Sequence, residues 1–150
     1  GRKENNPLPS KEDNWIIRKK MEKKFGLSET EYELMEFFWE SDRKLSFREI
    51  LDYFNEIKKK DWKKQTLSSF LTILQKEGHI KTDISGKKYL YYPSRTKQKH
   101  IKVWMKQLCK ESFDNSLLKF VQAFTGGERI SHETAQELRD YLDQLEDKEK

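Results

Sequence analysis

The sequence predicts a mainly α-helical fold with one small β-hairpin. Two capping boxes and one apolar stripe indicate three consecutive helices, after which the hydrophobic pattern changes to period two and then returns to helices. Three helices followed by a hairpin is the order of elements in a winged helix-turn-helix. We therefore expect a winged helix-turn-helix followed by a C-terminal helical region.

Composition restricts the class of protein. Charged residues make up 38% of the 150 residues and hydrophobic residues only 34%, so burial must be confined to narrow faces of amphipathic elements. Four Trp, six Tyr and nine Phe argue against disorder throughout the chain. No apolar run of about 18 residues occurs, so we expect no membrane insertion. A cytoplasmic protein is the simplest interpretation.

Charge is distributed unevenly along the chain. The net charge is +5, from 31 Lys and Arg against 26 Asp and Glu. Residues 43–93 carry 12 basic and 6 acidic side chains, and residues 94–124 carry 7 and 2. Acidic blocks at 27–42 and 125–150 flank this basic stretch. Such separation favours a polyanionic partner, although a set of solvated helix faces stays open as the simpler alternative.

The first 26 residues form a basic N-terminal extension with two of the three prolines. We expect residues 1 to about 13 to be a flexible arm and residues 14–25 to form a short basic helix. The extension is a separate segment before the winged-helix domain, which we place at 27–93.

Capping boxes predict where the first two helices of this domain begin. The pairs are Ser28 with Glu31 and Ser46 with Glu49. Helical spacing of apolar residues after each pair predicts helices over about 29–41 and about 46–58.

The third helix is indicated by an apolar stripe with i, i+3, i+4, i+7 spacing. The stripe is Leu67, Phe70, Leu71 and Leu74. Gly78 is well placed to end this helix. Residues 79–84 and 87–92 then read as two strands joined by a tight turn at Ser85-Gly86, and Pro93 ends the hairpin.

The face of the third helix opposite its stripe is mostly short and uncharged. This face carries Gln65, Ser69, Thr72 and Lys76, with Ser68 beside them. Glutamine can pair with adenine, and hydroxyl side chains can donate, accept or contact a thymine methyl group. We predict that this face reads DNA in the major groove; the alternative is an ordinary solvated face.

Lysines surround the proposed groove face. Five of them lie around Trp62, namely Lys58, Lys59, Lys60, Lys63 and Lys64. Two more, Lys87 and Lys88, lie at the hairpin tip, with Lys81 across the hairpin. Lysines at these places suit phosphate contacts, and a solvated hairpin tip is the alternative for the wing. The predicted DNA-binding residues are Lys63, Lys64, Gln65, Thr66, Ser68, Ser69, Thr72, Lys76, Lys87 and Lys88.

After residue 93 the pattern is helical again, over about 94–111, 116–124 and 131–146, with a break at Gly126-Gly127. We interpret residues 94–150 as a helical dimerisation domain, because these helices are too short to form a core of their own. The predicted interface residues are Val103, Leu108, Leu117, Leu118, Val121, Phe124, Leu138, Tyr141, Leu142 and Leu145. Packing of these residues back onto their own winged helix is the alternative.

Several stretches of the chain match one family of regulators. In the first half they are residues 28–35 running to Trp39, then Trp62 through Thr66 and Leu67 with Leu71, Leu74, Lys76 and Gly78, and then Tyr89 to Pro93. In the second half they are residues 113–116, Phe120, Val121, Phe124, and residues 130–142. Over about residues 27–146 the chain resembles the penicillinase-repressor (BlaI/MecI) family.

The resemblance implies a dimeric winged-helix transcriptional repressor, not an enzyme, that binds palindromic double-stranded operators without a cofactor. Its C-terminal helices would form the homodimer. The resemblance also implies control of β-lactam resistance genes, with repression released when a membrane-bound β-lactam-sensing metalloprotease triggers cleavage. An ungapped register places the cleaved bond at Gln107-Leu108, where better-known members carry Asn-Phe.

The chain departs from the family pattern at several positions. Ile73 stands where the family commonly has Arg, and Glu77 where it has Lys. Cys109 alone cannot supply the cysteine-rich metal site of copper-responsive relatives, so we expect no metal site.

Two other functions remain open from the sequence. The winged helix could bind an acidic protein instead of DNA, or a small ligand between the helices of a dimer could be the signal. The operator, the regulated genes and the inducing signal do not follow from the sequence.

Overall fold

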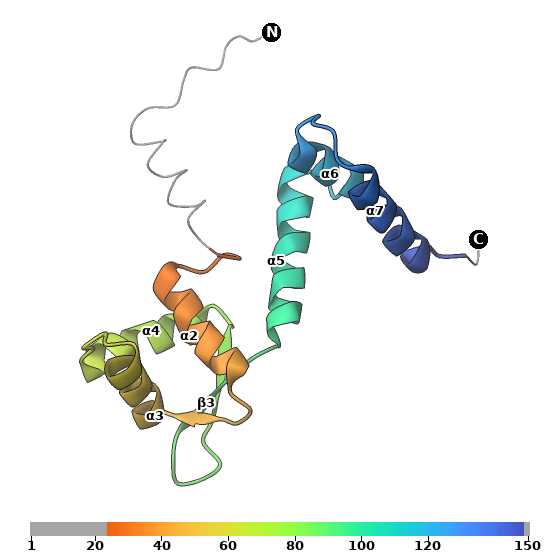
Figure 1. Ribbon diagram of the computed structural model, residues 1–150. Coiled ribbons are helices and arrows are strands. Elements are labelled where there is room, and N and C mark those ends of the chain that lie inside the picture. Colours follow the sequence, from red (N-terminus) through yellow and green to blue (C-terminus); the bar gives the residue numbers. More distant parts are fainter. Residues whose placement is uncertain (1–23, 149–150) are drawn as a thin grey trace, which may run out of the picture. The chain divides into compact units, whose positions relative to one another are not determined.

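Residues 24–148 are described by the structure, a computed structural model whose main elements are labelled in Figure 1. The chain divides into two compact units between Met105 and Lys106. The elements in chain order are α2 (Glu29–Glu40), β1 (Leu45–Ser46), α3 (Phe47–Asp52), the π-helix η1 (Tyr53–Ile57), α4 (Lys64–Lys76), β2 (Ile80–Asp83), β3 (Leu90–Pro93), α5 (Lys97–Ser112), α6 (Leu117–Thr125) and α7 (His132–Leu145). The predicted winged helix-turn-helix followed by a helical C-terminal region is confirmed.

The predicted N-terminal extension lies outside the described residues, apart from its last three. Lys24 and Leu27 pair there through two backbone hydrogen bonds of 2.9 Å, with Phe25 and Gly26 at positive φ between them. The helix predicted over 14–25 therefore does not reach Lys24 and Phe25, because these residues form a turn. Its remaining positions lie outside the described residues.

Both predicted capping boxes are formed. The amide of Glu31 donates to Ser28 Oγ at 3.2 Å, and the amide of Ser28 donates to Glu31 Oε1 at 2.8 Å. Ser46 and Glu49 form the same reciprocal pair at 3.2 and 3.0 Å. Each box satisfies backbone donors that a helix start leaves free, which explains why α2 and α3 begin where the sequence predicts.

The second helix is not α-helical to its end. It continues from α3 into the π-helical η1, within which Phe54 is buried and Asn55 is half-buried. The wider turn changes the direction of the side chains near the end of the helix, a feature that the apolar spacing did not predict.

A single core holds the first unit together. The apolar stripes predicted for the three helices meet here, and β1 and β2 add one residue each. The buried hydrophobic residues are Leu27, Tyr32, Leu34, Met35, Phe38, Leu45, Ile50, Leu51, Phe54, Leu67, Leu71, Leu74 and Ile80. Burial of each large side chain contributes about 1.5–3 kcal/mol, so this core is the main source of stability in the unit.

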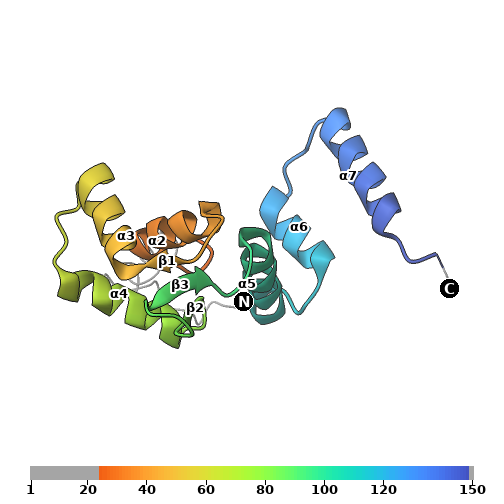
Figure 2. The same ribbon diagram turned by 90° about the horizontal axis from the view of Figure 1, so that it is seen from below.

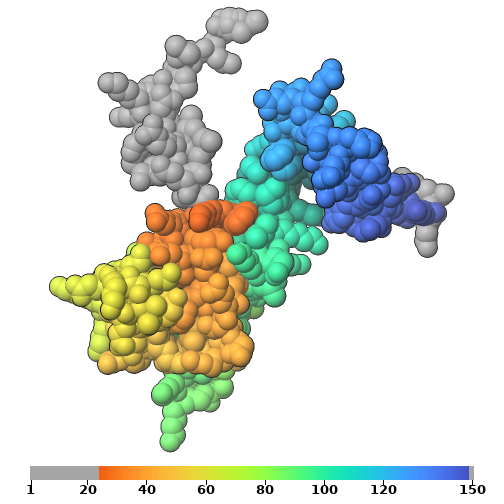
Figure 3. Space-filling view, viewed as in Figure 1, coloured from red at the N-terminus to blue at the C-terminus, as the bar shows by residue number. Residues whose placement is uncertain are grey.

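The sheet has three antiparallel strands in the order β1-β3-β2 (Figure 2). The predicted tight turn at Ser85-Gly86 is wrong. Asp83 pairs with Leu90, so residues 84–89 form a longer loop, which projects from the surface of the unit (Figure 3). Asp83 stabilises the beginning of this loop, because its Oδ1 accepts bonds from the amide and hydroxyl of Ser85 at 2.9 and 2.6 Å.

The first part of α5 packs on the winged helix. The Trp104 indole lies against Gly26 so closely that a Cβ at Gly26 would sit 2.8 Å from the Trp104 ring, and Trp104 also makes an edge contact with Phe25 at 5.8 Å. His100 is buried, with its Nε2 3.0 Å from the carbonyl oxygen of Phe25. The first compact unit consequently extends past Pro93 to Met105.

The second unit consists of the end of α5, α6 and α7. Ser116 and Ser131 cap α6 and α7, and Gly126 ends α6 in the left-handed conformation. Between α5 and α6, the amide of Asn115 donates to the carbonyl oxygen of Cys109 at 3.0 Å. No side chain among residues 106–148 is fully buried, although α6 and α7 are amphipathic.

Candidate nucleic-acid interface

Helix α4 separates an apolar face from a polar one. Leu67, Leu71 and Leu74 are buried, and the helix packs against β2. The opposite face is exposed, as the sequence predicts, and carries Gln65, Ser68, Ser69, Thr72 and Lys76. Thr66 is half-buried, so less of its side chain is available to DNA than of the other predicted residues.

Two hydroxyls on the exposed face are bonded to their own helix. Ser69 Oγ donates to the carbonyl oxygen of Gln65 at 3.0 Å, and Thr72 Oγ1 donates to that of Ser68 at 2.8 Å. Their hydrogens are therefore used within α4, while their oxygen lone pairs remain available as acceptors. In this conformation the two side chains suit base amino groups, which are donors.

Ile73 adds an apolar group to the same face. Its side chain is 42% exposed, next to Thr72 and one turn from Ser69 and Lys76. The sequence analysis noted Ile73 only as a departure from the family. Its position outside the stripe of Leu67, Phe70, Leu71 and Leu74 was the available signal that it faces outward. An exposed branched side chain here can contact a thymine methyl group.

The N-terminus of α4 is unusual in its electrostatics. Its N-cap residue is Lys63, which makes no side-chain capping bond, and Lys64 follows; the first turn holds no acidic residue. Positive side chains at this end oppose the helix dipole, which favours anions there. A phosphate group at this position would offset the unfavourable charge and accept bonds from free backbone amides.

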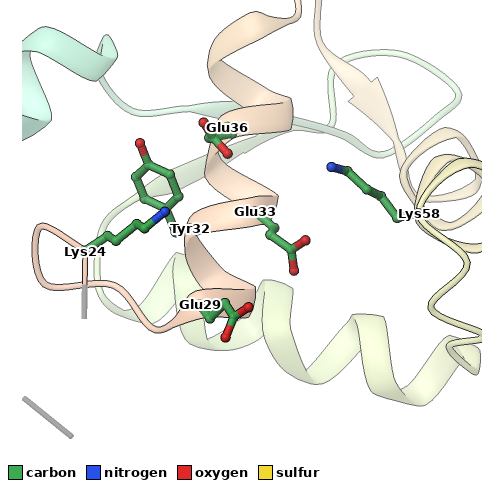
Figure 4. A pocket seen from close by; sticks show the side chains of 6 residues that line it. All are labelled: Lys24, Glu29, Tyr32, Glu33, Glu36 and Lys58. Atoms are coloured by element: carbon green, nitrogen blue, oxygen red, sulfur yellow. The ribbon is translucent and has the colours of Figure 1, made fainter. Parts of the chain in front are cut away.

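The basic turn, residues 58–64, connects η1 to α4, and its lysines divide into two groups. Lys60 Nζ lies 2.8 Å from Glu33 Oε1 on α2, and Lys58 extends toward the same acidic face across a pocket of about 460 Å³ (Figure 4). Lys59, Lys63 and Lys64 are exposed. The sequence analysis grouped all five lysines around Trp62 and selected Lys63 and Lys64 as DNA-binding, but it did not predict the pairing of Lys60 with α2, because that pairing depends on the tertiary fold.

The pocket itself does not suggest a separate ligand. It is lined by Glu29, Glu33 and Glu36 from α2, with Lys24, Lys58 and Tyr32. These opposite charges partly compensate one another.

The wing loop, residues 84–89, carries Lys87 and Lys88, and both are exposed. Lys81 pairs with Tyr92 at the other end of the hairpin, so it does not lie across from the tip lysines. The Lys44 ammonium contacts Asp83 at 2.8 Å and, with the Ser85 bonds, holds the pKa of the Asp83 carboxyl well below its ordinary value. This network holds the start of the loop.

Comparison with known proteins agrees with this arrangement. A family model described as Penicillinase repressor matches residues 27–144, which is most of the chain and covers part of each unit. The chain belongs to the penicillinase repressor family. This family consists of DNA-binding transcriptional regulators and not enzymes. A search of curated proteins gives no match.

For a penicillinase repressor, the position of the predicted cleavage bond matters. Gln107 and Leu108 lie inside α5, two residues beyond the boundary at Met105, and Gln107 Nε2 donates to Glu111 Oε2 at 2.6 Å. The bond is thus helical in this structure. Within residues 24–148, none of the helices has the length and apolar character needed to span a bilayer.

The predicted dimer residues of this penicillinase repressor are largely accessible. Nine of them are exposed, namely Val103, Leu117, Leu118, Val121, Phe124, Leu138, Tyr141, Leu142 and Leu145. Leu108 is half-buried. Their role in dimerisation stays a prediction, as does the DNA-binding role of the residues on α4 and the wing.

Proposed function

We propose that this chain is a dimeric, sequence-specific repressor of operator DNA, and that β-lactam resistance genes are its targets. The observation that carries the proposal is the exposed face of α4 in a penicillinase repressor. That face combines short polar side chains with an uncapped, lysine-bearing N-terminus. Such a helix fits the major groove and meets a phosphate at its positive end.

Each part of this surface has a different task. Gln65, Ser69 and Thr72 would contact base edges, which determines sequence preference. Lys63 and Lys64, and Lys87 and Lys88 on the wing, would contact phosphates, which adds affinity without sequence information. A bound repressor then blocks access of the polymerase to the promoter.

The second unit supports dimerisation. Its amphipathic helices expose Leu118, Val121 and Phe124 on α6 and Leu138 and Leu142 on α7. An apolar surface of this kind marks an interaction site, and a two-fold dimer would match a palindromic operator. Residues 125–150 carry 8 acidic and 4 basic side chains, and this acidic stretch would lie away from DNA in the dimer.

Release of repression would occur by cleavage at Gln107-Leu108, triggered by a membrane-bound sensor protease. A cut between the two units would separate the DNA-binding winged helix from the dimerising helices. Because the bond is helical, α5 must unwind locally before a protease can bind it. Intact mass of the protein before and after β-lactam treatment of cells tests this step; an unchanged mass would point to ligand-induced release instead.

The DNA-binding proposal is tested by the salt dependence of affinity for a duplex selected by the protein from a random library. The double variant Lys63→Ala with Lys64→Ala should weaken binding to all sequences and reduce the slope of log K against log salt by about one per phosphate contact. The matched control is Arg139→Ala with Lys148→Ala, which removes two charges from the acidic C-terminal stretch. An equal slope in both double variants would contradict the assignment.

Base readout is tested with the same duplex. Gln65→Ala or Ser69→Ala should reduce discrimination by about 1–3 kcal/mol at one base pair per half-site. Equal losses on selected and scrambled duplexes would mean that α4 does not read sequence. If the unmodified chain shows no preference at near-physiological salt, the basic face serves an acidic protein partner.

A further inference from the structure

The connection between η1 and α4 contains a clamp that neither the family match nor the sequence analysis assigns. We propose that Asn55 is a positioning residue for DNA binding, which holds the basic turn so that Lys63 and Lys64 reach the phosphate backbone. The inference rests on the proposed DNA binding, and concerns how the chain builds its phosphate-contacting surface.

One side chain makes both bonds of the clamp. Asn55 Nδ2 donates to the carbonyl oxygen of Trp62 at 2.9 Å, and the amide of Trp62 donates to Asn55 Oδ1 at 2.6 Å. Asn55 thereby satisfies both backbone polar groups of the residue that precedes Lys63. Only a carboxamide offers a donor and an acceptor at the two ends of so short a side chain.

The π-helix explains how Asn55 comes to lie at this place. Asn55 is the middle residue of η1, Tyr53–Ile57, where the helix is wider than an α-helix. Single π-turns in helices are frequent at functional sites, since they redirect side chains. The widened turn directs Asn55 at the returning chain seven residues later.

The basic turn needs a restraint of this kind. Lys59 and Asp61 both have positive φ, at 59° and 56°, a conformation that costs energy for residues other than glycine. The exposed Lys59, Lys63 and Lys64 repel one another as well. Without the clamp, both effects favour relaxation of the turn to other conformations.

Aromatic packing fixes the other end of the clamp. The Trp62 ring stacks on the buried Phe54 at 4.9 Å and contacts Phe70 of α4 at 5.4 Å. Its backbone and ring together are thus bound to η1 and to α4. The position of Trp62 then determines where Lys63 begins the recognition helix.

A double-mutant cycle in the full chain tests whether Asn55 acts through the lysines. Asn55→Ala should weaken binding to the selected duplex about five- to twentyfold and reduce the salt slope by about one. In the Lys63→Ala/Lys64→Ala background the same substitution should have little further effect, because the groups that it positions are gone. The affinity and salt slope of Asn55→Ser are measured in parallel. Serine is also small but keeps a polar group at this half-buried position, so this variant serves if Asn55→Ala does not fold.

The control is Ile50→Val, which changes the buried core of the same unit without touching the turn. It should lower the unfolding midpoint but leave the affinity of the folded protein and its salt slope unchanged. An unchanged slope for both Asn55 variants, or an equal fold-loss with and without the two lysines, would show that Asn55 has a structural role only. Loss of the slope in the Lys63/Lys64 variant but not in the Asn55 variants would leave DNA binding intact and overturn this inference alone.

Discussion

The winged helix and the C-terminal unit contrast in how they use similar local sequence. Both are made of amphipathic helices that begin at a serine cap, at Ser28 and Ser46 in the first and at Ser116 and Ser131 in the second. In the first unit the apolar faces converge on one core, whereas the faces of α6 and α7 remain accessible. Helix formation is local, but burial requires a facing surface, which residues 24–105 provide for one another in the first unit.

The two units should differ in the source of their stability. Packing of apolar faces, more than local propensity, stabilises helices in proteins. The first unit therefore should have a stability independent of protein concentration. The second should gain much of its stability from a second copy of the chain. Four substitutions test the comparison, in order of decreasing effect.

The largest effect is expected for Phe54→Ala. Phe54 has no exposed surface and stacks on Trp62, so truncation creates a cavity in the only core of the first unit among the described residues. The expected loss is about 3–5 kcal/mol. Urea unfolding followed by Trp fluorescence measures it at several protein concentrations. A loss that varies strongly with concentration would contradict an autonomous winged helix.

The corresponding substitution in the second unit is Phe124→Ala. Phe124 is 83% exposed, so its truncation should scarcely change unfolding of the dilute protein. It should instead raise the dissociation constant of the proposed dimer by about tenfold or more, because an apolar anchor is removed from the proposed interface. Sedimentation equilibrium measures this constant, with Gln122→Ala on the same helix as the control. Equal constants for both variants would exclude this part of α6 from the interface.

A smaller effect is expected at the end of α4. Gly78 has a φ of 81°, so Gly78→Ala should cost about 1 kcal/mol through backbone strain alone, since nothing lies within 4 Å of an added Cβ. Gly86 in the wing loop has the same open surroundings without a positive φ. Gly86→Ala should therefore be neutral in urea unfolding. Similar losses for both would indicate a cause other than φ.

The smallest effect is a dependence on pH. Burial, with the neighbouring His100 and Arg95, lowers the pKa of His79 below its ordinary value of 6.5, against an opposing effect of Glu31. The unfolded chain then binds this proton more readily, so the stability contribution is complete above about pH 6.5 and is lost as pH falls through the folded pKa. The urea concentration at the unfolding midpoint should therefore be lower at about pH 5.5 than at about pH 7.5.

His79→Gln should reduce that decrease. Removal of the exposed His132 on α7 should leave it unchanged. A decrease of the same size in the His79 variant would assign the titration to another group.

Sequence reasoning located the elements whose determinants are local. The capping boxes at Ser28 and Ser46 and the stop at Gly78 depend on residues within one or two turns, so their spacing was sufficient. The exposed face of α4 also followed from periodicity. Its functional interpretation needed the family match in addition.

The features that were missed depend on distant partners. Strand β1 has two residues, too few for a period, and it exists because Leu45 and Ser46 pair with β3. The tight turn in the wing was wrong because strand pairing ends at Asp83 and Leu90, where the Asp83 side chain accepts bonds from Lys44 and Ser85. The π-turn that carries Asn55 had no sign in the apolar pattern, because Phe54 fits an α-helical stripe equally well.

The packing of Trp104 against Gly26 affects the N-terminal product of the cleavage that we propose at Gln107-Leu108. The N-terminal product would keep α5 through Trp104, and so would retain a closed core and an intact α4 surface. It would no longer be linked to the winged helix of a second copy. The high effective concentration that keeps both winged helices of the proposed dimer on one operator would be lost as well. The cleaved winged helix would then dissociate from DNA while it is still folded. Intact repressor made afterwards would compete with these single winged helices for the same half-sites.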